Sequence, residues 1–143
     1  MIEEQPVSGS DGQYRRVVDP GTQLEMLVPA EIPDDRAVDH ARREQAGELH
    51  RIRFFLDWGH DYPLWESFTD KYAMEPDDYG ISSELGRRLN DWSLFWHRHF
   101  DPFDGWDESR NQTRWLATGD ELVRLLEVEV YDIAVVLPQF RPS

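Results

Sequence analysis

The aromatic residues of this chain are concentrated in its last two-thirds. Of the 18 Phe, Trp and Tyr residues in the 143-residue sequence, only Tyr14 precedes residue 51. Aromatic side chains bury more apolar surface than most others, and this burial drives folding. We therefore expect the core of the fold to be assembled mainly from residues 51–143, with the first 50 residues attached to it.

The charge balance restricts the kinds of partner that the chain can bind. Twenty-nine acidic and 15 basic residues give a formal charge of −14. Such a field repels phosphate backbones, so we expect no direct nucleic-acid partner. It attracts basic proteins and speeds encounter with them, although acidity can also serve solubility alone.

The sequence carries no cysteine, so it offers neither disulfides nor thiolate ligands for a metal. The first ten residues lack the basic and apolar parts of a secretory signal. No apolar run approaches the roughly 20 residues that a membrane-spanning helix needs. These observations predict a cytoplasmic protein with no membrane partner, and they leave its oligomeric state open.

The N-terminal part shows weak signals for secondary structure. Residues 1–22 are rich in Gly, Pro, Ser and Asp, which predicts a flexible arm with an ordered turn at residues 19–21. Apolar residues alternate over 23–28, as in a short strand. Asp34 can cap a helix that continues to about Leu49.

Two long helices have clearer sequence patterns. Ser82 can cap a helix over 83–100, whose apolar residues all fall on one stripe. A second helix is expected over 111–127, with Gly119 inside its apolar stripe. Glycine there costs about 1 kcal/mol relative to alanine, which the close approach of another backbone or a Trp ring would explain. Tolerated imperfection is the alternative.

Two further strands complete the expected core. Residues 51–57 alternate between apolar and charged side chains, and residues 133–137 are continuously apolar. The sequence therefore predicts an α+β fold. Its small sheet is expected to contain the strands near 23–28, 51–57 and 133–137, with the two long helices packed on one face. We expect a single domain over 23–143.

Residues 59–81, here called the aromatic connector, are too long and too aromatic to be structureless in a compact domain. Pro63 and the apolar residues after it allow a short helix. The start of this region follows a strand end, where binding sites gather. Its aromatic rings could either pack over the sheet or recognise a partner. The predicted binding residues are Asp57, Trp58, His60, Asp61, Tyr62 and Trp65.

Other polar groups raise catalytic and metal-binding alternatives. His60 with Asp57 or Asp61 could provide a general base for a small hydrolase or lyase. His97 and His99 have the spacing of some metal motifs, but on a helix they point about 200° apart and cannot share one ion. Acidic residues crowd the segment 101–108 without the spacing of a calcium loop. We therefore predict no catalytic residue, no metal and no cofactor.

Three stretches, DWGHDYPLW, EPDDYGISSELGRRLNDW and WLATGDELVRLL, carry a resemblance. They resemble a set of uncharacterised small acidic proteins from GC-rich bacteria, over about residues 52–137. The resemblance implies the α+β fold and brings no activity or cofactor. The positions that carry it are Pro63, Leu64, Trp65, Pro76, Asp78, Ser82, Leu85, Trp92 and Gly119.

These features favour a non-enzymatic protein that binds a basic protein partner, such as an immunity protein or an antitoxin. A small hydrolase or lyase is the first alternative, using either His60 with Asp57 or Asp61, or a metal at His97 and His99. A mimic of DNA that occupies a nucleic-acid site on an enzyme is the second.

Overall fold

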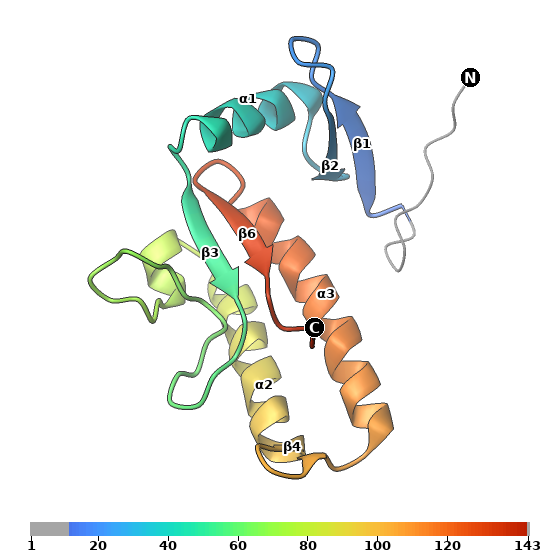
Figure 1. The fold of residues 1–143 in the computed structure, drawn as a ribbon, viewed down its shortest axis with the longest axis vertical. Helices are drawn as coiled ribbons and strands as arrows, with labels where there is room; N and C mark the ends of the chain where they lie inside the picture. Colours follow the sequence, from blue (N-terminus) through green and yellow to red (C-terminus); the bar gives the residue numbers. More distant parts are fainter. Residues whose placement is uncertain (1–11, 143) are drawn as a thin grey trace. The chain divides into compact units, whose positions relative to one another are not determined.

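The computed structural model describes residues 12–142 and divides into two compact units, with the boundary between Leu49 and His50 (Figure 1). Residues 1–11 of the predicted flexible arm lie outside the described part. Residues 14–18 form a strand, so the prediction of a flexible arm over 1–22 is wrong there. A single domain over 23–143 stays a prediction.

The N-terminal unit is a β-hairpin followed by a helix. Strand β1 (Tyr14–Val18) pairs antiparallel with β2 (Glu25–Pro29), and helix α1 covers Asp34–Gln45. The predicted turn at 19–21 is confirmed, because the buried Asp19 carboxylate accepts a hydrogen bond from Gly21 N at 2.8 Å. α1 ends earlier than predicted, and Gly47 follows it with a φ of 73°.

The C-terminal unit contains a parallel strand pair and the two long helices. Strand β3 (His50–Phe54) runs parallel to β6 (Ala134–Pro138), with Ile52 opposite Val136. Helix α2 spans Ser83–His99 and helix α3 spans Ser109–Glu129, close to the predicted ranges. Two-residue strands β4 (Phe100–Asp101) and β5 (Gly105–Trp106) join these helices, and a 3₁₀ helix, η1, covers Pro76–Tyr79.

The α+β class is confirmed, but the predicted three-stranded sheet is wrong. β2 pairs with β1, whereas β3 and β6 pair with each other. The short turn between β1 and β2 explains the difference, because closing a short loop costs less entropy than pairing distant strands. The strands near 23–28, 51–57 and 133–137 therefore exist but belong to two separate sheets.

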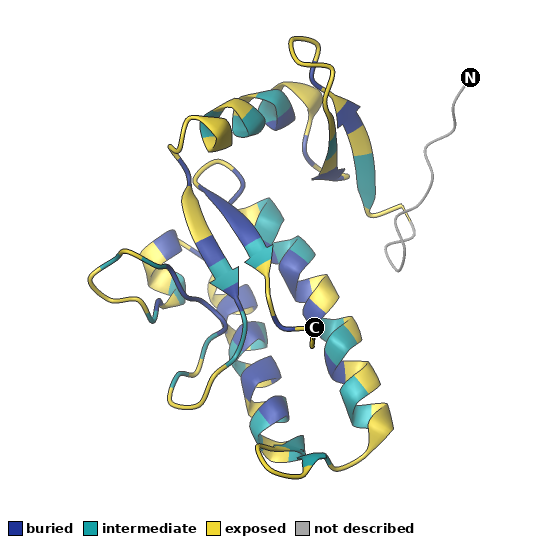
Figure 2. Cartoon of the chain, viewed as in Figure 1, coloured by how far each residue is buried: buried dark blue, intermediate teal, exposed yellow. Residues whose placement is uncertain are grey.

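Both long helices pack on one face of the β3–β6 pair, as predicted. The buried faces of α2 and α3 turn toward each other and toward these strands (Figure 2). Trp92 of α2 stacks on Trp115 of α3, with ring centroids 4.5 Å apart and an angle of 2° between the planes. The core also contains Ile52, Phe54, Leu85, Leu89, Trp96, Leu122, Leu126, Ala134, Val136 and Phe140.

The start of α2 and the end of α3 are held together by polar contacts. The Ser82 hydroxyl accepts from Leu85 N at 3.2 Å, which confirms Ser82 as the N-cap of α2. The same residue donates to the Glu129 carboxylate through its backbone N at 2.8 Å and its hydroxyl at 2.7 Å. The start of α2 is thereby fixed to the end of α3.

Gly119 lies where aromatic rings come closest to α3. A Cβ atom at this position would stand 2.6 Å from Phe140 Cε2 and 2.8 Å from Trp92 Cζ2. Real Cβ atoms do not approach other heavy atoms this closely. The close approach of the Phe140 and Trp92 rings therefore explains the glycine, which decides between the two explanations that the sequence left open.

We predict that Gly119→Ala destabilises the protein although it improves helix propensity. The added methyl must displace Trp92 or Phe140, and overpacking of this kind costs about 1–3 kcal/mol. Gly86→Ala in α2 is the matched control, since its Cβ would meet Pro76 Cγ at 3.4 Å, an ordinary contact. Its stability should stay unchanged or rise by up to about 1 kcal/mol. Urea unfolding of both variants tests this, and equal effects would contradict it.

Candidate functional site

The aromatic connector is ordered by pairing with the free edge of β3. Arg53 and Trp65 exchange backbone hydrogen bonds of 2.7 and 3.1 Å, and Met74 N donates to Leu64 O at 2.9 Å. The short helix allowed after Pro63 is absent from the described connector. The edge of β3 that β6 leaves free satisfies these backbone groups instead.

A buried carboxylate fixes the far part of the connector. Glu66 is only 8% exposed, and its Oε1 accepts a 2.8 Å hydrogen bond from the Tyr79 hydroxyl. Its Oε2 lies 3.0 Å from His50 Nδ1. Because an unpaired buried carboxylate is costly, these contacts hold η1, β3 and the connector in one arrangement.

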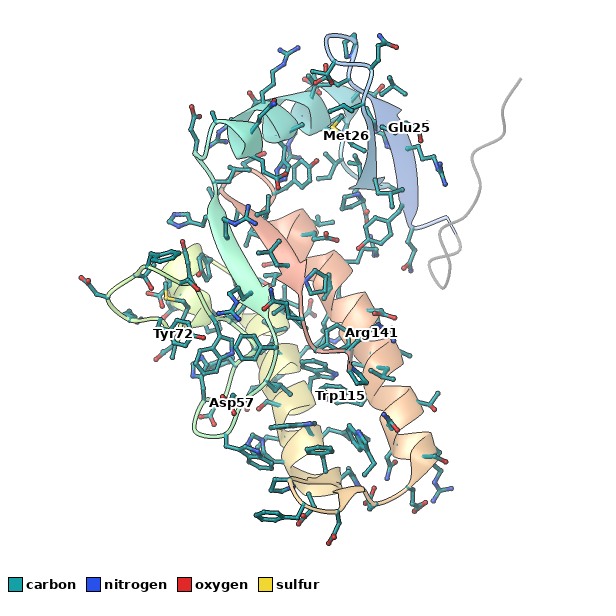
Figure 3. All side chains as sticks on the ribbon, viewed as in Figure 1. Glu25, Met26, Asp57, Tyr72, Trp115 and Arg141 are labelled. Atoms are coloured by element: carbon teal, nitrogen blue, oxygen red, sulfur yellow. The ribbon has the colours of Figure 1, made fainter. Side chains whose placement is uncertain are left out.

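Residues 67–72 form a compact tip, here called the connector tip. The Thr69 hydroxyl donates to Glu66 O at 2.8 Å and accepts from Tyr72 N at 3.0 Å. Glu66 N donates to Tyr72 O at 2.9 Å, which closes the tip. The Arg53 guanidinium donates to the Tyr72 hydroxyl at 3.2 Å and so orients that ring (Figure 3).

The connector tip presents two aromatic rings in an unusual backbone conformation. Phe68 is fully exposed and Tyr72 is 41% exposed, and their φ angles are 65° and 60°. Left-handed backbone is unfavourable for residues other than glycine, and such conformations gather at functional sites. Within residues 12–142, the other exposed aromatic residues are Trp58 and Phe103.

The structure brings three of the predicted binding residues together. His60 contacts Tyr62 and Trp65 edge to face, at centroid distances of 6.1 and 4.9 Å. Trp65 also contacts Tyr72 at 5.0 Å, so these rings continue to the connector tip. Trp65 is 8% exposed and its indole nitrogen donates to Phe55 O at 2.9 Å. Its ring therefore supports the exposed rings from below.

Of the other three predicted binding residues, Trp58 lies against α2, Asp57 precedes it, and the Asp61 carbonyl accepts a hydrogen bond from Asn90 Nδ2 of α2 at 3.4 Å. Trp58 packs on Trp96 at 4.5 Å and on His97 at 4.8 Å, and it remains 44% exposed. Asp57 accepts a hydrogen bond from Trp58 N at 2.8 Å, and Asp61 is exposed. The exposed members of the predicted set are therefore Asp57, Trp58 and Asp61.

One ring nitrogen of His60 makes a structural contact. Its Nε2 lies 2.8 Å from Met74 O, so the ring links the two ends of the connector. The structure gives no hydrogen bond between His60 and the carboxylate of Asp57 or Asp61 in residues 12–142. The arrangement expected of a His–Asp catalytic pair is therefore not assembled here.

The histidines at the end of α2 bind different neighbours. His97 Nδ1 lies 2.8 Å from Ser93 O, whereas His99 Nδ1 lies 2.8 Å from Asp107 Oδ2. Hydrogen bonds from Asn111 and His99 lower the pKa of Asp107. Across the described chain, no three His, Asp or Glu side chains converge as ligands for one metal ion.

Negative charge is concentrated in and beside the aromatic connector. Residues 57–78 contain seven acidic residues and a single base, Lys71. The Lys71 ammonium lies 2.6 Å from Asp78 and lowers the pKa of that carboxyl. Apart from the buried Glu66, the acidic residues of this stretch are exposed. Within residues 12–142, no helix has the length and apolar character to cross a membrane.

Sequence reasoning missed Phe68 and the contacts of Glu66. Phe68 is the only apolar residue in SFTDK (residues 67–71), and an isolated aromatic residue in a polar run is a usable signal for an exposed anchor. Glu66 offers no such signal, because its partners lie 13 and 16 residues away in the sequence.

We predict that Tyr79→Phe removes a stability contribution that depends on pH. Burial and the hydrogen bond to Glu66 raise the pKa of Tyr79 well above its ordinary value of 10.0. A raised pKa in the folded state means that this contribution is fully present below pH 10.0 and is lost as the pH rises further.

The variant should unfold with a free energy about 1–3 kcal/mol below that of the wild type at pH 7. This difference should shrink above pH 10. Urea unfolding from pH 7 to 11 measures it, and a difference that stays constant over this range would contradict the assigned role of the hydroxyl.

Comparison with known proteins assigns the C-terminal unit to a family. Among curated proteins, none matches the chain significantly. The family described as Serratia CdiI immunity protein-like matches residues 50–137. This range begins at β3 and ends within β6, so it contains the connector and both long helices, and it agrees with the range of the resemblance found in the sequence. The chain belongs to the Serratia CdiI immunity protein-like family.

Proposed function

We propose that this protein neutralises a toxin by binding it through the connector tip and the adjacent exposed residues. Membership of an immunity-protein family implies a protein partner, a toxin. The observation that carries the choice of surface is the pair of exposed rings, Phe68 and Tyr72, held at the connector tip in left-handed backbone.

Phe68 has the properties of an interface anchor. Its ring is fully exposed, so binding can remove its whole apolar surface from water. The tip is already closed by the Thr69 and Glu66 hydrogen bonds. A preorganised loop loses little conformational entropy on binding, which favours affinity. Phe68 should therefore insert into an apolar pocket on the toxin.

Tyr72 and the predicted residues extend this surface. The Tyr72 ring is supported by Trp65 from below, and Arg53 fixes its hydroxyl. Tyr and Trp dominate the few residues that contribute most binding energy in interfaces. Figure 3 shows Asp57 in the loop beyond the end of β3. We include Trp58 and the exposed acids Asp57, Asp61 and Asp70 in the proposed surface.

The exposed acidic residues within 57–78, here called the acidic rim, favour a basic partner. Their carboxylates give the surface a negative potential that steers a positively charged toxin toward it. The same potential disfavours nucleic acid as a direct partner. The absence of cysteine from the sequence fits action in the reducing cytoplasm, and we include that location in the proposal.

We predict that Phe68→Ala weakens toxin binding by about 30-fold or more, since hot-spot truncations cost about 2 kcal/mol or more. The toxin is first captured with the tagged wild-type chain from cells of the source organism and identified by mass spectrometry. Calorimetric titration then compares the variants, and co-expression with the toxin reports protection of growth.

Phe103→Ala is the matched control, because Phe103 is 93% exposed but follows β4, outside the proposed surface. Both variants should keep the wild-type thermal stability, since neither ring is buried. Equal affinity of Phe68→Ala and the wild type would refute the connector tip as the anchor. Enzymatic turnover of the captured protein, in place of stoichiometric binding, would refute the proposed mode of action.

We also predict that toxin binding weakens as the salt concentration rises, mainly because the association rate falls. Screening shortens the reach of the acidic rim to about 8 Å at physiological ionic strength and to about 3 Å at 1 M salt. Surface plasmon resonance from 0.05 to 1 M NaCl should show a falling association rate with a smaller change in dissociation rate. An association rate independent of salt would contradict a basic partner.

A further inference from the structure

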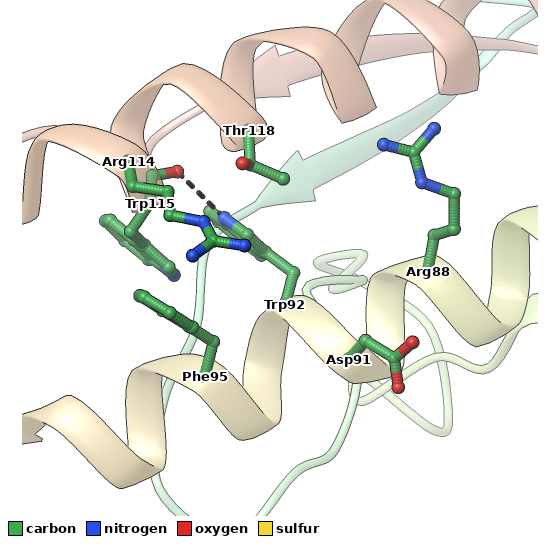
Figure 4. A pocket seen from close by; sticks show the side chains of 7 residues that line it. All are labelled: Arg88, Asp91, Trp92, Phe95, Arg114, Trp115 and Thr118. Carbon is green, nitrogen blue, oxygen red and sulfur yellow. Dashed lines mark hydrogen bonds between the residues drawn. The ribbon is translucent and has the colours of Figure 1, made fainter. Parts of the chain in front are cut away.

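A pocket of about 200 Å³ opens between α2 and α3, apart from the connector tip. It is lined by the rings of Trp92, Phe95 and Trp115 and by the side chain of Thr118 (Figure 4). A cavity of about 150 Å³ is large enough for benzene. The pocket can therefore hold one ring or an apolar group of similar size.

One wall carries a buried hydrogen-bond donor without an acceptor. Trp92 Nε1 donates to Trp115 O at 2.9 Å, but Trp115 Nε1 is buried and has no hydrogen-bond partner within residues 12–142. Figure 4 shows the Trp115 nitrogen turned toward the side of the pocket where Phe95 and Arg114 lie. A buried donor left unpaired costs about 1–3 kcal/mol, so an acceptor placed here would be stabilised.

The charges around this donor favour an anionic acceptor. The Arg114 guanidinium lies over the Phe95 ring, with Cζ 5.6 Å from the ring centroid, and forms no ion pair in the described part of the chain. Arg88 also lines the pocket, although it pairs with Glu121 at 3.3 Å. Asp91 is the one carboxylate in the lining, and Figure 4 shows it beside Arg88, away from Arg114.

We propose that this pocket binds a carboxylate attached to an apolar group of about the size of a benzene ring. The apolar group lies against Trp92, Phe95 and Trp115, and the carboxylate accepts hydrogen bonds from Trp115 Nε1 and the Arg114 guanidinium. Arg114 is exposed, so its side chain can swing from Phe95 onto the ligand. A free aromatic acid and the C-terminal residue of a peptide share this chemistry.

Titration of the ¹⁵N-labelled full chain with sodium benzoate tests the proposal. The Trp115 indole N–H signal, assigned by its loss in Trp115→Phe, should move downfield and saturate. Benzyl alcohol, which has the ring without the charge, should bind at least tenfold more weakly. N-acetylphenylalanine represents the end of a peptide, and tighter binding than benzoate would assign the pocket to that source.

Arg114→Met should weaken benzoate binding about tenfold or more, because it removes a charged donor. Arg87→Met is the matched control, since Arg87 is an exposed α2 arginine outside the pocket lining and should leave binding unchanged. A Trp115 signal that does not respond, or equal losses in both arginine variants, would overturn the proposal. This test does not measure toxin binding, so a negative result would leave the proposed function unaffected.

Discussion

The stack of Trp92 on Trp115 is the contact on which the C-terminal unit depends. The two rings lie parallel at 4.5 Å, and Phe140 contacts both of them edge to face. Phe140 also contacts Phe54 of β3, so one cluster of rings joins both helices, the strand pair and the C-terminal segment. This cluster can form only because Gly119 leaves space for it on α3. The rigid platform that results lets the connector carry exposed rings without weakening the core.

The sequence predicted the parts of the fold that periodicity controls. The helices over 83–100 and 111–127 and the Ser82 cap followed from local pattern, whereas the reason for Gly119 was left open between a close approach and tolerated imperfection. Strand pairing did not follow from local pattern, since the choice between β1 and β3 as the neighbour of β2 depends on loop closure and not on side-chain pattern. The shape of the connector could not be predicted from the sequence either. It depends on pairing with the free edge of β3 and on Glu66, whose partners are distant in the sequence.

The sequence predicts binding residues in and just before the connector, but it does not show which of the rings there are exposed. The aromatic connector was singled out on composition, and His60, Tyr62 and Trp65 do form one ring cluster. Composition alone could not separate supporting rings from exposed ones, although the polar neighbours of Phe68 in the sequence are a local signal of exposure. Only the fold shows that Trp65 is buried by Phe55 and Tyr72 while Phe68 stands in solvent.

The left-handed backbone at Phe68 and Tyr72 has an evolutionary consequence. Glycine would adopt these angles without strain, so a chain optimised for thermodynamic stability alone would gain from glycine at either position. Aromatic side chains there mean that some resistance to unfolding is given up. Laboratory evolution of this protein under heat selection, without a requirement for binding, should therefore erode the connector tip before it alters the helices.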